Sequence, residues 1–298
     1  MNEKEFIQHI QKIKPSVAPL LVGIGDDAAV FKNNFRKLSL LASDMLCEGV
    51  HFLSEEDPKL IGRKAMAVNL SDIAAMGGNP KLALLSIAVP KERGASYMLD
   101  IFEGARSLAE TYGVQICGGD TNRSLRDVNV CVTVLGETEG AGALLRSGAK
   151  VGDAILVSGT LGGSFESRKH LLFDPRVKEG LYLNRNYTVH AMADISDGLI
   201  RDLGNILEAS HCGAVLYPDK IPFSEALKNS LNTEEEKLDR ALTDGEDFEL
   251  VFTMNEKDAD RLIKENSFFT KVGFLIQEEG LFWPDGSPIN LQGYIHHW

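Results

Sequence analysis

Residues 57–89 read DPKLIGRKAMAVNLSDIAAMGGNPKLALLSIAV, and this stretch predicts a helix followed by a buried strand. Asp57 is a favourable N-cap, and Pro58 suits the first helical position because the N–H that proline lacks has no partner there. We expect the helix to stop near Gly77, since glycine readily ends a helix. The apolar run over 81–89 then predicts a strand. The core of the chain is therefore expected to include an α/β unit.

The same alternation of helix and strand continues on both sides of this unit. Upstream, residues 38–41 predict a buried strand. Downstream, residues 96–112 have helical spacing, and the short strand predicted over 114–117 leads directly into a glycine-rich segment at 118–121. Valines at every second position from Val128 to Val134 predict a further strand that ends near Glu137.

A segment rich in glycine and alanine, residues 139–152, is the candidate boundary between two domains. A second series follows, with strands expected over 154–158, 213–217, 248–254 and 271–276, and helices expected after Gly198 and over 256–264. A chain of 298 residues is also long enough for two domains. We therefore predict a two-domain α/β protein with domains 1–138 and 139–298.

Charge and glycine content are the unusual parts of the composition. The chain has 31 Lys and Arg against 43 Asp and Glu, a net charge of −12 and a pI near 5.1, which disfavours binding nucleic acid through bulk positive charge. Its 28 glycines often stand beside aspartates. The first residues are charged throughout, and no apolar run approaches the roughly 20 residues that cross a bilayer. We expect a soluble, cytoplasmic protein that does not bind membranes and has reduced cysteines.

Aspartates recur beside small residues at predicted turns and strand ends, where we expect their carboxylates to converge. The segments are Gly25-Asp26-Asp27, Ser43-Asp44, Ser71-Asp72, Gly119-Asp120 and Asp194-Ile195-Ser196-Asp197. One such pair alone is typical of a turn, but Asp72 lies inside a predicted helix, where aspartate is unfavourable. Carboxylates that face one another repel unless cations neutralise them, and Mg²⁺ prefers oxygen ligands. The set therefore predicts a site for several Mg²⁺ ions.

A glycine-rich segment, SGTLGGS at residues 158–164, lies between a predicted strand and a predicted helix. Such a segment is either a cradle for phosphate or a simple strand-to-helix turn. The Walker A motif and the protein-kinase motifs are both absent from the sequence. If the chain handles ATP, metal ions held by carboxylates must supply more of the charge neutralisation.

Seven motifs follow one another along nearly the whole chain. They are GIGDDAAVF at 23–31, SDMLCEGVHF at 43–52, GRKAMAVNLSDIAAMGGNP at 62–80, GGDT at 118–121, RSGAKVGD at 146–153, ADISDGL at 193–199 and DGEDFELVF at 244–252. In this order they resemble the thiamine-monophosphate kinase family of the aminoimidazole-ribonucleotide-synthetase-like superfamily. The resemblance implies an N-terminal domain that forms a β-barrel with a second subunit, and a C-terminal α/β domain that covers the nucleotide.

The resemblance also implies an activity and a set of residues. The activity would be phosphorylation of thiamine monophosphate by ATP, with several Mg²⁺ ions, in a homodimer. The metal ligands would be Asp27, Ser43, Asp44, Asp72, Asp120, Asp194 and Asp197, and Asp26 is a further candidate from its position alone. The nucleotide would meet Gly119, Asp120, Arg146, Ser196 and Phe102, and the thiamine would meet His51, Glu246 and Tyr294. Two departures are Ala42, where the family often has a hydroxyl residue, and Phe102, in place of a tyrosine.

The chemistry of this reaction agrees with the residues available. The acceptor is a phosphate oxygen that is already largely ionised at neutral pH, so little general-base help is needed. We therefore expect direct in-line transfer, with Asp44, Asp72 and Asp120 anchoring the metal ions and Arg146 supplying a cation. Two alternatives remain at this point: another ATP-using synthetase of the same superfamily, or a non-catalytic sensor of nucleotide or divalent cation.

Overall fold

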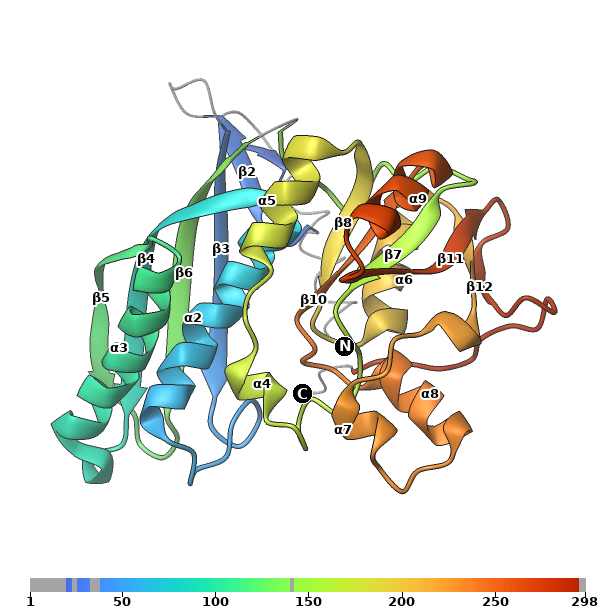
Figure 1. Ribbon diagram of the computed structural model, residues 1–298. Helices are drawn as coiled ribbons and strands as arrows, with labels where there is room; N and C mark the ends of the chain where they lie inside the picture. Colours follow the sequence, from blue (N-terminus) through green and yellow to red (C-terminus); the bar gives the residue numbers. More distant parts are fainter. Residues whose placement is uncertain (1–19, 23–25, 33–37, 140–141, 295–298) are drawn as a thin grey trace.

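The computed structural model describes residues 20–22, 26–32, 38–139 and 142–294. Two six-stranded sheets, each flanked by helices, lie on opposite sides of the molecule (Figure 1). This mixed α/β architecture confirms the predicted fold class. Among the described residues, no helix is long and apolar enough to cross a membrane.

The first sheet has the strand order β1-β2-β3-β6-β4-β5 and is antiparallel except for the pair β4 and β5. Its strands are β1 (Leu20–Val22), β2 (Ala29–Lys32), β3 (Leu38–Cys47), β4 (Gly78–Val89), β5 (Gln115–Arg123) and β6 (Asn129–Thr138). Helices α2 (Pro58–Ala75) and α3 (Gly94–Thr111) cover one face of it (Figure 1). The alternate valines of β6 point to this covered face and are fully buried. The other face, which we call the outer face, stays exposed.

The second sheet has the order β12-β9-β11-β7-β10-β8. Its strands are β7 (Ala154–Ser158), β8 (Val189–Ile195), β9 (Gly213–Leu216), β10 (Glu249–Met254), β11 (Phe269–Ile276) and β12 (Gly280–Phe282). The helices of this half are α4 (Lys169–Leu172), α5 (Val177–Asn186), α6 (Leu199–Ser210), α7 (Glu225–Lys228), α8 (Glu234–Thr243) and α9 (Glu256–Glu265), with a short 3₁₀ turn at Pro218–Lys220 (η2). A second 3₁₀ turn, Lys91–Arg93 (η1), precedes α3 in the first half.

Helix α2 lies at the centre of the molecule and is buried along most of its length. Its N-terminus has the expected cap, because the Asp57 carboxylate accepts a hydrogen bond from the N–H of Lys59 at 2.8 Å. A Cβ atom at Gly62 would lie 1.8 Å from the carbonyl oxygen of Ile101, so α2 and α3 approach each other backbone to backbone. On another side α2 packs against α4, α5 and β8. Both halves of the chain are thus built on this one helix.

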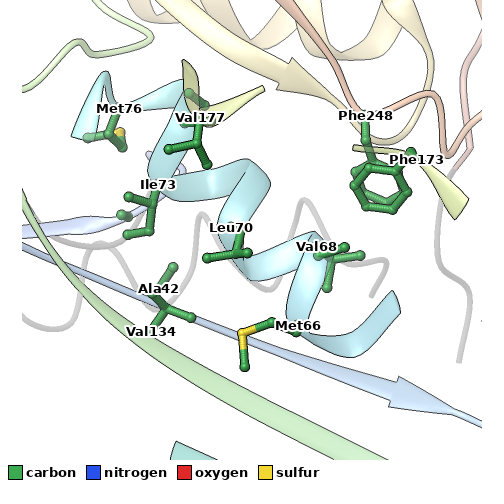
Figure 2. Close-up of a cluster of buried hydrophobic side chains, with 14 of the residues drawn as sticks. Ala42, Met66, Val68, Leu70, Ile73, Met76, Val134, Phe173, Val177 and Phe248 are labelled. Carbon is green, nitrogen blue, oxygen red and sulfur yellow. The ribbon is translucent and has the colours of Figure 1, made fainter. Parts of the chain in front are cut away.

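A single hydrophobic cluster joins the two halves through α2 (Figure 2). Leu70 and Ile73 of α2 belong to it together with Val134 of β6. From the second half it includes Phe173 and Phe248, whose rings stack with centroids 4.1 Å apart. The second half also has a hydrophobic cluster of its own, whose buried members lie between Ile155 and Ile289. The predicted boundary at 139–152 therefore separates the two sheets but is crossed by the first cluster, and the functional division into domains 1–138 and 139–298 stays a prediction.

Three elements differ from the sequence expectations. Strand β3 continues to Cys47 because its residues pair one by one with β6, so Asp44 lies inside a strand and not at its end. Strand β5 continues to Arg123 along β4 and includes the glycine-rich segment at 118–121. The segment 158–164 is followed by turns, and the first helix after it is the single turn of α4.

Candidate active site

Three aspartates from different parts of the chain meet beside α2. Asp27 follows β1, Asp72 lies on α2 and Asp194 lies on β8. One carboxylate oxygen from each lies within 4.8 Å of the others. The hydroxyl of Ser71 donates to the carboxylate of Asp194 at 2.6 Å, which fixes α2 and β8 relative to each other. We call Asp27, Asp72 and Asp194, together with Asp44, the aspartate cluster.

The fourth member of the cluster is held by α2 as well. The backbone N–H of Asp44 donates to the side-chain oxygen of Asn69 at 3.0 Å, and Asn69 precedes Asp72 by three residues on the same side of the helix. The carboxyl groups of Asp72 and Asp44 are hydrogen-bonded to each other. Sequence reasoning did not single out Asn69, although its spacing to Asp72 in the string NLSD was the available signal.

The cluster concentrates negative charge at partly buried positions. Burial, followed by the charges of Asp44, Asp194 and Asp27, raises the pKa of Asp72 well above its ordinary value. Burial and the charge of Asp27 do the same for the pKa of Asp194. Burial also raises the pKa of Asp44. Oxygen-only ligands with this excess of charge form a site that suits a hard divalent cation.

Arg146 is the cation that faces the cluster from the second half of the chain. Its guanidinium donates to both carboxylate oxygens of Asp27, at 2.7 and 3.1 Å, and its backbone N–H donates to Asp26 at 3.2 Å. Burial and the charge of Asp27 raise the pKa of Asp26 to about 7. Arg146 thus neutralises the carboxylate of Asp27, and it makes no such paired hydrogen bonds to Asp44, Asp72 or Asp194.

A cavity of about 510 Å³ opens beside the cluster. It brings together eight of the predicted site residues, which are Asp44, His51, Asp72, Asp194, Ser196, Asp197, Glu246 and Tyr294. Phe165, His170 and Phe248 add apolar and aromatic surface. The cavity is therefore large enough for a small organic ligand, and carboxylates contribute to its lining.

Lys64 is a buried residue beside this cavity that sequence reasoning missed. Its side chain has no exposed surface, and its ammonium group donates to both carboxylate oxygens of Glu246 at 2.6 and 2.7 Å. It also donates to the carbonyl oxygen of His51 at 2.7 Å. The only signal in the sequence was that this charged residue directly precedes the apolar run AMAV, which itself predicts burial.

The loop that carries Glu246 has an unusual backbone. Glu246 and Phe248 have φ values of +64° and +49°, which side-chain-bearing residues rarely adopt. The N–H groups of these residues donate to the carbonyl oxygens of Ser196 and Ile195, both at 2.7 Å, so the loop is fixed to the end of β8. Strained conformations held in this way are typical of functional sites.

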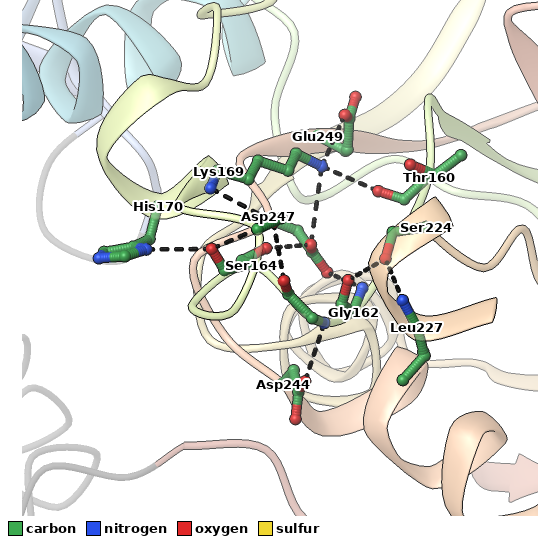
Figure 3. A network of polar contacts seen from close by, with 12 residues as sticks. Thr160, Gly162, Ser164, Lys169, His170, Ser224, Leu227, Asp244, Asp247 and Glu249 are labelled. Carbon is green, nitrogen blue, oxygen red and sulfur yellow. Dashed lines mark hydrogen bonds and ion pairs between the residues drawn. The ribbon is translucent and has the colours of Figure 1, made fainter. Parts of the chain in front are cut away.

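The same loop continues into a buried polar network (Figure 3). The Glu249 carboxylate accepts hydrogen bonds from Lys169 and Ser158, and from Nε and Nη2 of the Arg176 guanidinium, at 2.6–2.9 Å. Asp247 accepts from the hydroxyl of Ser164 at 2.5 Å. The network pairs these buried charges and so holds the loop rigidly.

The glycine-rich segment 158–164 is part of this network. Its backbone N–H groups bind carboxylates of the chain and do not form a phosphate cradle. The N–H of Gly162 donates to Asp247 at 2.9 Å and the N–H of Gly163 donates to Asp244 at 3.0 Å. These donors already serve carboxylates of the same chain. The segment is therefore the turn that the sequence left as the alternative.

A further acidic residue shapes the other side of the site. The buried carboxylate of Asp202 accepts hydrogen bonds from the N–H groups of Ser196 and Asp197, both at 2.9 Å. It thus orients the loop that carries these two predicted site residues. Asp202 lies in the first turn of α6, where an acidic residue also interacts favourably with the helix dipole. Because that interaction is an ordinary reason for an aspartate at this position, the sequence did not indicate its hydrogen bonds to the loop.

Four predicted site residues lie away from the aspartate cluster within one chain. Ser43 points to the outer face, where its hydroxyl lies 2.9 Å from that of Thr133. Gly119 and Asp120 lie on the exposed strand β5, and Asp120 is in register with Ser86 of β4. Phe102 lies on α3 and is 39% exposed. Their roles stay predictions.

Comparison with known proteins gives consistent matches over nearly the whole chain. Residues 25–138 match the N-terminal domain of AIR synthase related proteins, and residues 137–273 match their C-terminal domain. Thiamine-monophosphate kinase of Rhodopirellula baltica is 37% identical, over 94% of this chain and 91% of the relative. The enzyme of Escherichia coli K12 is 34% identical, over 97% and 96%.

Solved structures agree with the sequence matches. The structure described as "AaThiL complexed with AMPPCP and TMP" superposes with a TM-score of 0.87 at 31% identity, over 99% of this chain and 97% of that one. Thiamine-monophosphate kinase of Stenotrophomonas maltophilia K279a superposes with a TM-score of 0.77 at 32% identity, over 96% of both chains. This chain therefore belongs to the thiamine-monophosphate kinase family of AIR synthase related proteins.

Proposed function

We propose that this protein transfers the terminal phosphoryl group of ATP to thiamine monophosphate, forming thiamine diphosphate and ADP. One observation carries the proposal: Asp44, Asp72 and Asp194 of the aspartate cluster line the same cavity as His51, Glu246 and Tyr294. The relatives at 34–37% identity are kinases with this activity, and AaThiL was solved with an ATP analogue and TMP. A kinase of this kind needs both groups that hold metal ions near the phosphates and side chains that bind the organic part of the acceptor.

The residues of the cluster fit Mg²⁺. Asp27, Asp44, Asp72 and Asp194 would hold it, with Asp26 and Asp197 beside them, since these carboxylates are close together and exceed the cations available to pair with them. When bound, Mg²⁺ would neutralise the phosphate chain and the charge that develops during transfer. The raised pKa values of Asp72 and Asp194 support the proposal, because a cation would relieve the repulsion that causes them.

The side chains of this chain mainly position the two anions. The acceptor oxygen is largely ionised at neutral pH, so we assign no residue as general base. His51, Glu246 and Tyr294 would bind the thiamine part, which places the acceptor phosphate toward the aspartate cluster and in line with the ATP phosphates. Arg146 and Ser196 would face the nucleotide, and the Arg146–Asp27 pair would fix the end of the first half against the second.

A homodimer accounts for the residues that lie apart from the cluster. The outer face exposes apolar side chains, including Leu41, Met45 and Leu84 at 40–55%, and ends in the edge strand β5. Met45 also lines the cavity, so the cavity reaches this face. We propose that a second copy covers the outer face, forming the intersubunit barrel, and that the partner subunit's Gly119 and Asp120 complete the nucleotide site.

This arrangement gives the two parts of the chain different roles. Residues 1–138 would supply most metal ligands and the dimer contact, and residues 139–298 would cover the nucleotide and carry the loop with Glu246. The departures at Ala42 and Phe102 fall on the first part. Phe102 would then meet the adenine through ring contact alone, without the hydrogen bond of a tyrosine hydroxyl.

ADP release with thiamine monophosphate, compared with unphosphorylated thiamine, tests this function. We expect wild-type protein with Mg²⁺ to use the monophosphate at least about 100-fold better, because the acceptor is its phosphate oxygen. Asp120→Asn should impair turnover, and Asp285→Asn, which changes an exposed turn residue, should not. Faster use of thiamine would refute the substrate assignment. Binding of ATP and Mg²⁺ without any ADP release would identify a sensor instead.

A further inference from the structure

Lys64 is a charged side chain in the interior of the protein that no step of the proposed transfer uses. It lies on α2, eight residues before Asp72, and has no exposed surface. A buried ion pair contributes little net stability, since apolar residues of similar volume often stabilise a fold as well or better. Because Lys64 contacts two residues that line the cavity, its burial calls for an explanation in terms of binding.

The hydrogen bonds of Lys64 connect two lining residues of the cavity from different halves of the chain. An ammonium group has three donors, and here they serve Glu246 Oε1, Glu246 Oε2 and the carbonyl oxygen of His51. Glu246 is also fixed through its backbone, whose N–H donates to Ser196. Lys64 thus orients the Glu246 carboxylate and also fixes the backbone of the turn that contains His51.

The paired carboxylate of Glu246 keeps binding capacity toward the cavity. Its side chain is 32% exposed, and a carboxylate has about four lone-pair sites, of which Lys64 uses two. Because the ammonium group balances its charge, this carboxylate is better suited to accept a hydrogen bond from a neutral donor than to pair with a second cation. The strong neutral donor of thiamine monophosphate is the amino group on its pyrimidine ring.

We propose that Lys64 is a positioning residue that holds the Glu246 carboxylate to accept a hydrogen bond from the amino group of the substrate's pyrimidine ring. The inference rests on the proposed function and adds to it the part of the substrate that this end of the cavity recognises. Lys64 acts through Glu246 and does not touch the phosphates, so its effect falls on selection of the acceptor and not on ATP.

The test compares thiamine monophosphate with oxythiamine monophosphate, in which an oxo group replaces the pyrimidine amino group. We expect wild-type protein to prefer thiamine monophosphate by at least about 30-fold in kcat/KM, because the oxo group of the analogue cannot donate a hydrogen bond to the Glu246 carboxylate. In Lys64→Met the preference should fall at least about tenfold, mainly through KM for thiamine monophosphate, with KM for ATP within about twofold. Lys59→Met is the matched control, since Lys59 is an exposed lysine on the same helix.

A second variant makes the test independent of the folding of Lys64→Met. Glu246→Gln can donate to the oxo group and should shift the preference toward the analogue. In the double variant, Lys64→Met should add no more than about twofold to the effect of Glu246→Gln, since both changes act on one interaction. An unchanged preference in folded Glu246→Gln or Lys64→Met, or effects that multiply in the double variant, would overturn the inference. Wild-type protein that leaves thiamine monophosphate unused would refute the proposed function, and the inference with it.

Discussion

Asp72 is a half-buried acidic residue of α2 that lines the cavity, with other carboxylates of the cluster around it. Its sequence position was informative because aspartate is unfavourable inside a helix. The structure places it within 4.8 Å of Asp27 and Asp194, although 45 and 122 residues separate them from it along the chain. Asp202 carried no such signal, because an aspartate in the first turn of a helix is favourable, and Lys64 had only its position ahead of an apolar run. For both residues only the folded partner reveals the use of the side chain.

The first prediction concerns Asp72→Asn. The amide keeps the shape of the side chain but removes one charge from the cluster, so the repulsion among the carboxylates falls. We expect kcat for ADP release to drop at least about 100-fold, while the thermal midpoint in EDTA rises by about 2 °C or more. Added Mg²⁺ should stabilise the wild type more than the variant. A variant with full activity, or one less stable than wild type in EDTA, would contradict this account.

The second prediction concerns pH and Asp247. Burial raises the pKa of Asp247 to about 6, above the value of about 3.9 expected in the unfolded chain. Between these values the unfolded state loses its proton first, so the free energy of unfolding decreases as the pH rises from about 4 to about 6. The loss amounts to about 3 kcal/mol above pH 6.

Urea unfolding of Asp247→Asn at several pH values checks this sign. The variant should lack the Asp247 contribution, so its stability relative to wild type should improve as the pH rises from about 4 to about 6.5. Asp219→Asn, at an exposed position, should follow the wild-type curve. Parallel curves for Asp247→Asn and wild type would show that the carboxyl group ionises alike in both states.

Among the elements, α2 was the most predictable and the most consequential. Its N-cap at Asp57 and its end before Gly77 follow from local signals, and β7 was also found with its bounds. Strands β3 and β5 were underestimated because polar and glycine residues interrupt their apolar pattern. These strands are sustained by pairing with β6 and β4, which local sequence does not reveal.

The third prediction compares two glycines inside helices. Alanine normally stabilises a helix interior relative to glycine by up to about 1 kcal/mol. At Gly62, however, the added Cβ would lie 1.8 Å from the backbone of α3. At Gly204 of α6 a Cβ would meet nothing within 4 Å.

Gly62→Ala should therefore lower the free energy of unfolding by about 1–3 kcal/mol, and Gly204→Ala should leave it equal or higher. The same direction for both variants, in denaturant titrations, would disprove the close contact of α2 with α3.

For the whole molecule, the covered face of the first sheet was predictable from alternation, but the outer face was not recognised. Leu41 and Met45 lie at alternate positions of β3 and would be expected inside a core. These side chains are exposed in a single chain, but the sequence pattern of an apolar strand face is the same whether or not the chain itself covers that face. Likewise the contact between the two halves through α2 involves residues more than 100 positions apart along the chain.

The fourth prediction tests the outer face. Lysine at the centre of a subunit contact is strongly disfavoured, so Leu84→Lys should shift the protein from dimer to monomer in light scattering and reduce ADP release in parallel. Leu99→Lys, at a more exposed leucine on α3, should stay dimeric and active. Wild-type protein that is monomeric and fully active at all concentrations would refute both the dimer and the shared nucleotide site.

The central position of α2 also has a consequence for synthesis of the chain. The first half leaves the ribosome while the surfaces of α2 that will contact α4, α5 and β8 are still bare. That half cannot complete its hydrophobic cluster until Phe248, near the end of the second half, has been made. The nascent chain therefore exposes apolar surface of α2 until most of the second half has been made.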